Sequence, residues 1–132
     1  MNNDKKMLSI LIGLLLVSMT LAACSTPASS APAFPTGKFI KSGTVNYGLV
    51  FNTDRTFSVF DGDTTFVKGT YSVDGNVFTE TSNDGGCETN VSFTYTFDGT
   101  NLTFNYVGNP DDDVACTGRH ADFNNITYTL SK

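Results

Sequence analysis

The chain of 132 residues has no tryptophan and a single histidine, His120. A serine or cysteine nucleophile would have to rely on that one residue for its general base. Glu80 and Glu88 are the only glutamates, and nothing in their placement marks the paired acid and base of a glycosidase. We therefore expect a protein that is not an enzyme and that carries no cofactor.

Positive charge is also scarce. After residue 23, six basic side chains stand against twelve acidic ones, and the basic residues form no cluster. This balance argues against nucleic acid as a partner and against electrostatic binding to anionic lipid. The acidic run Asp111–Asp113 lacks the spaced ligands and the glycine of an EF-hand, so we interpret it as a solvated loop and predict no metal site.

The long apolar run, Met7–Leu21, follows Lys5 and Lys6 and ends in Leu21-Ala22-Ala23-Cys24. A basic start, an apolar core and small residues at the cut site are typical of a secretory signal peptide. The cysteine after the small pair resembles the lipobox of bacterial lipoproteins, which implies cleavage before Cys24 and attachment of palmitate-type acyl chains to it. The alternatives are an ordinary signal with a chance cysteine, or a transmembrane anchor, for which the run is short against about 17–25 residues.

The sequence divides into three parts: a lipoprotein signal peptide over 1–23, a lipidated flexible tether over 24–35 and a folded domain over 36–132. Residues 25–35 are small, rich in proline and uncharged, and cannot bury enough apolar surface to fold. We expect a lipid anchor in the cell membrane or the outer membrane, with the domain facing the periplasm or the exterior.

Two cysteines remain after Cys24, and both lie in loop-like segments. An even pair in an exported domain favours a disulfide between Cys87 and Cys116. A metal pair with His120 is the alternative, but no CxxC spacing supports it.

The rest of the chain alternates apolar and polar residues, and no segment shows a helical period. This alternation predicts strands with one face toward a core and the other toward water. The alternating residues are Val45-Tyr47-Leu49-Phe51, Phe57-Val59, Val91-Phe93-Tyr95-Phe97, Leu102-Phe104-Tyr106 and Ile126-Tyr128-Leu130. Eight or nine short strands joined by tight turns predict an all-β, antiparallel, up-and-down barrel of about eight strands.

Asp-Gly pairs at 74–75 and 98–99 predict two-residue hairpin loops. For the second, every large residue lands on one face. The expected facing pairs are Phe97–Thr100, Tyr95–Leu102, Phe93–Phe104 and Val91–Tyr106. For the first, the pairs Val73–Asn76, Tyr71–Phe78 and Gly69–Glu80 put Glu80 on the inward face. Glu80 then lies at the rim or is turned outward by a bulge, or it is a pocket group that holds a polar ligand atom or pairs with Arg119.

Several segments are similar to small bacterial lipocalin-like domains of the calycin group. They are Gly37-Lys38-Phe39, residues 51–57, residues 69–76 and residues 95–104. The resemblance implies an eight-stranded barrel whose interior holds a small apolar molecule. Lipocalins open with Gly-x-Trp, but Phe39 occupies that position here. The resemblance also makes Arg119 the candidate for the late arginine that packs over the tryptophan.

Barrels of about eight strands are either filled by side chains or hold one small ligand. The candidate ligand-binding residues are Tyr47, Leu49, Phe51, Phe57, Val59, Tyr71, Phe78, Glu80, Phe93, Tyr95, Phe104, Tyr106, Arg119 and Tyr128. The predicted function is a membrane-anchored lipoprotein that binds a small, mostly apolar ligand at the cell envelope. The alternatives are a protein-interaction or inhibitor module with a filled barrel and an envelope protein as partner, or a structural envelope lipoprotein.

Overall fold

The computed structural model describes residues 33–87 and 89–132. The predicted signal peptide, Cys24 and most of the predicted tether lie outside these residues. Within the described part of the chain, no helix has the length and apolar character needed to span a bilayer.

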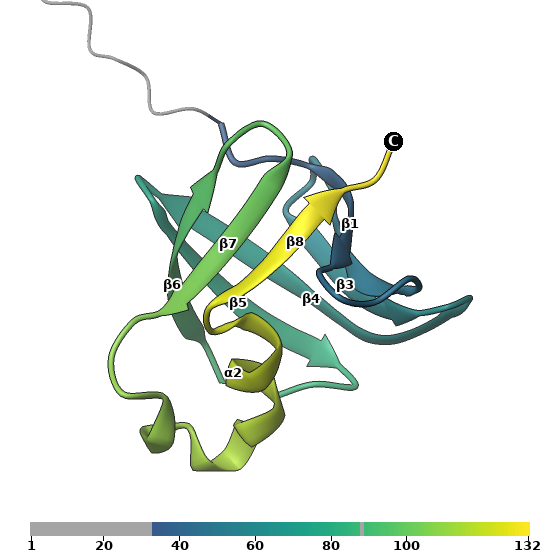
Figure 1. The fold of residues 1–132 in the computed structure, drawn as a ribbon. Helices are drawn as coiled ribbons and strands as arrows, with labels where there is room; N and C mark the ends of the chain where they lie inside the picture. Colours follow the sequence, from purple (N-terminus) through teal and green to yellow (C-terminus); the bar gives the residue numbers. More distant parts are fainter. Residues whose placement is uncertain (1–32, 88) are drawn as a thin grey trace, which may run out of the picture. The chain divides into compact units, whose positions relative to one another are not determined.

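Eight strands form a closed antiparallel barrel in sequence order, with β8 pairing back onto β1 (Figure 1). The strands are β1 (Gly37–Lys41), β2 (Tyr47–Phe51), β3 (Thr56–Asp61), β4 (Thr64–Asp74), β5 (Val77–Asp84), β6 (Val91–Phe97), β7 (Asn101–Tyr106) and β8 (Ile126–Leu130). The predicted all-β, up-and-down barrel of eight strands is confirmed. It is compatible with a lipocalin-like fold.

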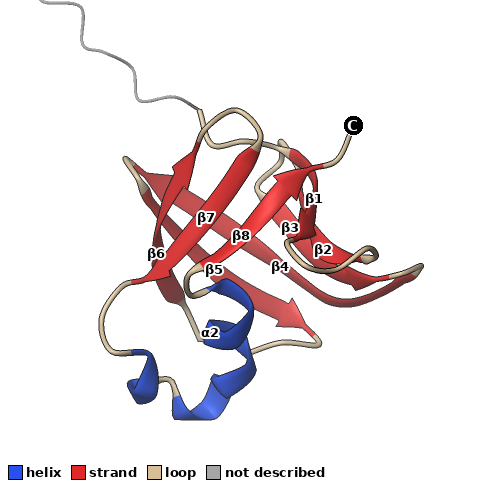
Figure 2. Cartoon of the chain, viewed as in Figure 1, coloured by secondary structure: helices blue, strands red, loops and turns tan. Residues whose placement is uncertain are grey.

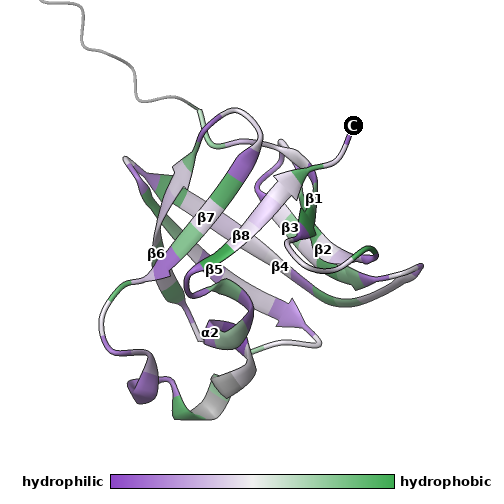
Figure 3. Cartoon of the chain, in the orientation of Figure 1, coloured by the Kyte–Doolittle hydropathy of each residue, from purple (hydrophilic) through white to green (hydrophobic). Residues whose placement is uncertain are grey.

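The alternation of apolar and polar residues places the apolar side chains inside the barrel. Along β7, Leu102 and Phe104 are buried, while the polar residues between and beside them are partly exposed, and bands of opposite hydropathy alternate along the strand (Figure 3). On the inward face of β4, Gly69 leaves room for the ring of Phe57, which a Cβ atom would strike. The period of two therefore sets which side chains reach the interior.

The hairpin between β6 and β7 has the predicted faces but a different register. Phe97 pairs with Leu102 and Tyr95 with Phe104, so each partner is displaced by two residues from the prediction. The cause is Asp98, whose carboxylate accepts hydrogen bonds from the backbone N–H of Thr100 (2.9 Å) and of Asn101 (2.7 Å). This Asx-type turn moves the loop to Gly99-Thr100, with the backbone N–H of Asp98 donating to the backbone oxygen of Asn101 at 3.2 Å. A shift of two keeps every side chain on its face.

The hairpin between β4 and β5 shows the same displacement, because its loop is Gly75-Asn76. Tyr71 faces Glu80, and Val73 faces Phe78. Tyr71, Phe78 and Glu80 all point inward and are buried, as the alternation predicts. Glu80 is 1% exposed, so neither the rim position nor the outward bulge applies.

Replacing Asp98 with alanine is expected to lower the free energy of unfolding near neutral pH. Hydrogen bonds from the backbone and side chain of Asn101, and then from the backbone of Thr100, hold the pKa of Asp98 below its usual range. The contribution is therefore present above the ordinary value of about 3.9 and is lost as the pH falls through the folded-state pKa. Urea unfolding at about pH 7 and about pH 2 tests this expectation. Asp98→Asn keeps an acceptor oxygen and serves as the control; an equal Asp-to-Ala loss at both pH values would contradict the assignment.

The connection between β7 and β8 is helical, contrary to the prediction that the chain has no helix. It contains two 3-10 turns, Pro110–Asp112 and Val114–Cys116, and then the helix α2 (Thr117–Phe123) (Figure 2). A helix of seven residues is too short for a periodic pattern to stand out. Tertiary contacts hold it: the ring of Phe123 packs 5.1 Å from that of Phe93 and 5.3 Å from that of Phe104.

Aromatic rings fill the end of the barrel opposite α2. Phe34, which we predicted to lie in the tether, is buried at this end of the barrel, with 8% of its surface exposed. Its ring centroid lies 4.9 Å from that of Tyr95, 5.1 Å from Phe51 and 5.2 Å from Phe78. The packed part of the chain therefore includes Phe34, because its ring fills the space between the strand ends where the proline-rich segment meets the barrel.

Phe34→Ala is expected to destabilise the folded domain by about 3–5 kcal/mol, since it deletes a buried ring and leaves a cavity. Phe34→Leu fills most of that space and should lose clearly less. Urea unfolding of both variants measures the difference. A loss below about 1 kcal/mol for Phe34→Ala would mean that the ring does not belong to the core.

Candidate functional site

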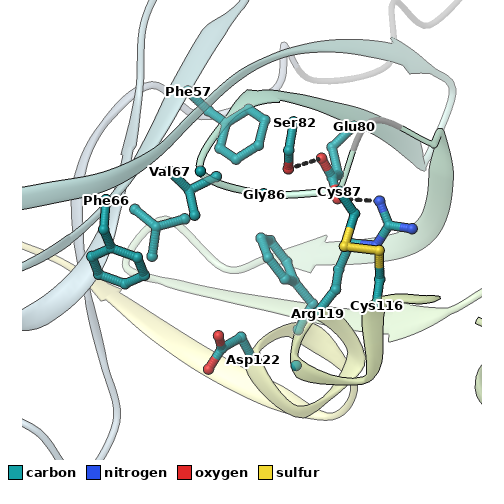
Figure 4. Close-up of a pocket in the computed structure, with 14 residues that line it drawn as sticks. Phe57, Phe66, Val67, Glu80, Ser82, Gly86, Cys87, Cys116, Arg119 and Asp122 are labelled. Atoms are coloured by element: carbon teal, nitrogen blue, oxygen red, sulfur yellow. Dashed lines mark hydrogen bonds and ion pairs between the residues drawn. A yellow bond between two sulfur atoms is a disulfide. The ribbon is translucent and has the colours of Figure 1, made fainter. Parts of the chain in front are cut away.

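A cavity of about 340 Å³ lies between the barrel wall and α2. It is at the end of the barrel where β4 begins and β5 ends, opposite the end that Phe34 fills. Its apolar wall consists of Phe57, Val59, Phe66, Val67 and Phe123, and its polar side chains are Glu80, Ser82, Arg119 and Asp122. Figure 4 shows Phe57, Phe66 and Val67 on one side and the Glu80–Arg119 pair beside the cysteines on the other.

The polar side of the cavity is built on Glu80 in β5. Nη1 of Arg119 donates to Oε1 of Glu80 at 3.1 Å, and the hydroxyl of Ser82 donates to Oε2 at 3.1 Å (Figure 4). Ser82 is two residues from Glu80 on the same strand, so both side chains point inward. Of the possibilities for Glu80, pairing with Arg119 is the one that the structure contains.

Arg119 in α2 uses all of its N–H donors. Nε and Nη2 donate to the two carboxylate oxygens of Asp113, at 3.1 Å and 3.0 Å. Nη1 also donates to the backbone oxygen of Thr89 at 2.6 Å, and Nη2 to the Thr89 hydroxyl at 3.1 Å. A guanidinium has five N–H groups, and with the bond to Glu80 each one has a partner. The arginine therefore joins α2 and the preceding segment to the end of β5 and to the loop after it.

Burial and charge act in opposite directions on this group. Burial raises the pKa of Glu80 above its usual range, although the Arg119 guanidinium partly offsets the effect. Burial lowers the pKa of Arg119, but the hydrogen bond to Asp113 and the charge of Glu80 outweigh it, so the pKa lies above its usual value. Arg119 therefore stays cationic. Asp113 is part of this network, whereas Asp111 and Asp112 are exposed like the solvated loop that we predicted.

Asp122 attaches the last turn of α2 to the barrel strands. Its carboxylate accepts a bond from the hydroxyl of Tyr47 at 2.7 Å and forms an ion pair with Lys41 at 2.9 Å. Its backbone oxygen accepts a bond from the hydroxyl of Tyr128 at 2.6 Å. Burial, followed by the hydrogen bond to Asp122, raises the pKa of Tyr47, so this hydroxyl keeps its proton and remains a donor. Three strands thus hold the C-terminal turn of α2 over the cavity.

The cysteine pair closes the same wall. Cys87 follows β5, Cys116 precedes α2, and both line the cavity. Their Cα atoms are 6.0 Å apart and the sulfurs are at disulfide distance, as predicted for this pair. The pair links the loop after β5 to the start of the helix.

The structure brings together only part of the predicted ligand-binding set. Phe57, Val59, Glu80 and Arg119 line the cavity. The others belong to the packed interior or its edge: Leu49, Phe51, Tyr71, Phe78, Phe93, Tyr95, Phe104 and Tyr128 are buried in the core, while Tyr47 and Tyr106 are partly buried against it. Filled space at the Phe34 end of the barrel thus occurs together with a cavity at the α2 end.

Sequence reasoning missed Ser82, Phe66, Val67, Asp122 and Phe123. The alternation in β5 could have found Ser82, which shares a face with Glu80. The last two lie in the helical connection that no pattern predicted. The lipocalin-type packing of a late arginine over the tryptophan position is also not present: Arg119 bonds to Glu80, Asp113 and Thr89, while the ring of Phe39 contacts Phe51 and Phe97.

Comparisons with protein-family models, with curated proteins and with solved structures found no match to this chain.

Arg119→Met is expected to lower the free energy of unfolding by about 3–5 kcal/mol, because it leaves a buried carboxylate without its partner. The double variant Glu80→Met with Arg119→Met should recover part of this loss, since both charges are then removed. Arg55→Met, at an exposed arginine, should change stability by less than about 1 kcal/mol and is the control. Urea unfolding of these variants and of the single variant Glu80→Met measures the coupling. If the losses of the two single variants simply added in the double variant, the ion pair would not couple helix and strand.

Proposed function

We propose that this protein is a membrane-anchored lipoprotein whose barrel binds a small, mostly apolar ligand in the cavity beneath α2. The observation that supports this proposal is the cavity itself. It has a volume of about 340 Å³, with aromatic and aliphatic side chains on one side and a few fixed polar groups on the other. Ligand pockets occupy roughly 300–1,000 Å³ and have this kind of lining.

The proposed place of action is the cell envelope. The basic start, apolar run and small residues before Cys24 support export and lipid attachment at that cysteine. The Cys87–Cys116 pair at disulfide distance supports an oxidising compartment. Two or more acyl chains give stable anchoring where a single chain is marginal. The barrel would then work next to the cell membrane or the outer membrane.

We propose that the protein binds its ligand and does not catalyse a reaction on it. The buried arginine and glutamate of the cavity hydrogen-bond to each other, which suits a fixed wall better than proton transfer. The second candidate is a module that binds an envelope protein. The filled, aromatic interior at the Phe34 end favours it, because a solid barrel presents its loops rather than its inside.

Native mass spectrometry of residues 33–132, after incubation with a bacterial membrane extract, tests the proposal. The expected result is an added mass that is lost on denaturation. Val67→Trp fills the cavity and should abolish the added mass. Val45→Trp places the same ring on a loop where the valine is 84% exposed, and should leave it unchanged. A mass without any addition, or an addition unaffected by Val67→Trp, would contradict the cavity as the ligand site and direct the search to protein partners.

A further inference from the structure

Among the described residues that line the cavity, charged carboxylates outnumber cations. The charged side chains that line it are Glu80, Asp122 and Arg119. With Asp113 and Lys41, which form ion pairs with this set, three negative and two positive groups leave a net charge of −1. The chain around it is acidic as well, with a net charge of −5. The balance alone favours a cationic ligand over an anionic one.

Arg119 is not available to an anion. Each of its five N–H groups already donates to Glu80, Asp113 or Thr89. A ligand carboxylate or phosphate would have to displace one of these bonds and would lie next to Glu80. Displacing a buried, charge-assisted bond and placing like charges together both oppose binding.

The carboxylates keep acceptor capacity. An ionised carboxylate has about four lone-pair sites. Glu80 accepts from Arg119 and Ser82, and Asp122 accepts from Lys41 and Tyr47, so each is engaged at two. The Ser82 hydroxyl donates to Glu80, which leaves its own lone pairs as further acceptors. The described polar side chains of the wall are thus arranged to receive hydrogen bonds.

Resting on the proposed function, we infer that the ligand is an apolar molecule bearing a protonated amine, held by the carboxylates of Glu80 and Asp122 while its apolar part packs on Phe57, Val67 and Phe123. A cavity of about 340 Å³ has the volume of roughly eleven water molecules at ~30 Å³ each. A single short chain or one ring system with an amine therefore fits its size, whereas a two-chain lipid does not.

The test compares three probes of one chain length, 1-octylamine, 1-octanol and octanoate, by isothermal titration calorimetry on residues 33–132 at neutral pH. Octylamine is expected to bind at least about tenfold more tightly than octanol, because its ammonium group adds one charge-assisted hydrogen bond. Octanoate should bind most weakly. Val67→Trp keeps every charge and should remove octylamine binding, which separates the cavity from attraction to the acidic surface.

Glu80→Gln is nearly the same size and removes one negative charge, so it should weaken octylamine about tenfold and octanol by much less. Its fold is checked by circular dichroism; if it does not fold, the order of the three probes on the unaltered chain still decides. Octanoate binding as tightly as octylamine, and lost in Val67→Trp, would overturn the amine inference but leave the binding function standing. No measurable binding of all three, together with no added mass from membrane extract, would overturn both.

Discussion

The ion pair between Glu80 and Arg119 is the interaction on which the cavity end of this barrel depends. An up-and-down barrel needs only short turns to close its sheet, and six of the seven connections between consecutive strands are short turns or loops. The connection between β7 and β8 is longer than the others, and it folds back over the open end of the barrel. A helix of seven residues has little stability of its own. Its position depends on what joins it to the wall, and Arg119 is bonded to β5, to the loop after β5 and to Asp113 at once.

The other attachments act on the same segment from different directions. Cys87 and Cys116 join the loop after β5 to the start of the helix, and Asp122 joins its last turn to Lys41, Tyr47 and Tyr128. Phe123 packs into the aromatic core between them. The cavity remains because these contacts hold α2 at the rim, while the inward positions near the end of β5 carry Glu80 and Ser82 in place of large apolar side chains. A buried carboxylate is stabilised here by its partner, and the same carboxylate gives the cavity its polar side.

The two ends of the barrel are covered in different ways. At one end Phe34 enters from the segment before β1 and completes an aromatic cluster with Phe51, Phe78 and Tyr95. At the other, a helix covers a space that side chains do not fill. The filled end and the cavity therefore lie at opposite ends of the same barrel.

Much of the fold follows from local pattern, whereas the site depends on long-range contacts. The alternation of apolar residues predicted the barrel and the inward direction of Tyr71, Phe78 and Glu80, because a period of two depends only on the pleat. The predicted register was wrong by two residues in both hairpins. At the second, the carboxylate of Asp98 binds the backbone N–H groups of Thr100 and Asn101, a choice that the apolar pattern does not show; at the first, the loop is Gly75-Asn76 and not Asp74-Gly75. The helix, Asp122 and Phe123 were missed for a related reason: residues 117–123 are ordered by Arg119, Cys116 and the core, not by their own periodicity. Phe34 was predicted to lie in the tether because proline and small residues surround it in the sequence.

Nuclear magnetic resonance of the ¹⁵N-labelled domain, titrated with a bacterial membrane extract, tests the proposed ligand site beneath α2 most directly. A ligand in the cavity is expected to change the chemical shifts mainly of residues 66–67, 80–87 and 118–123, and to leave the loops at 75–76 and 98–100 unaffected. Changes centred on those two loops and around Phe34, with the residues beneath α2 unmoved, would contradict it.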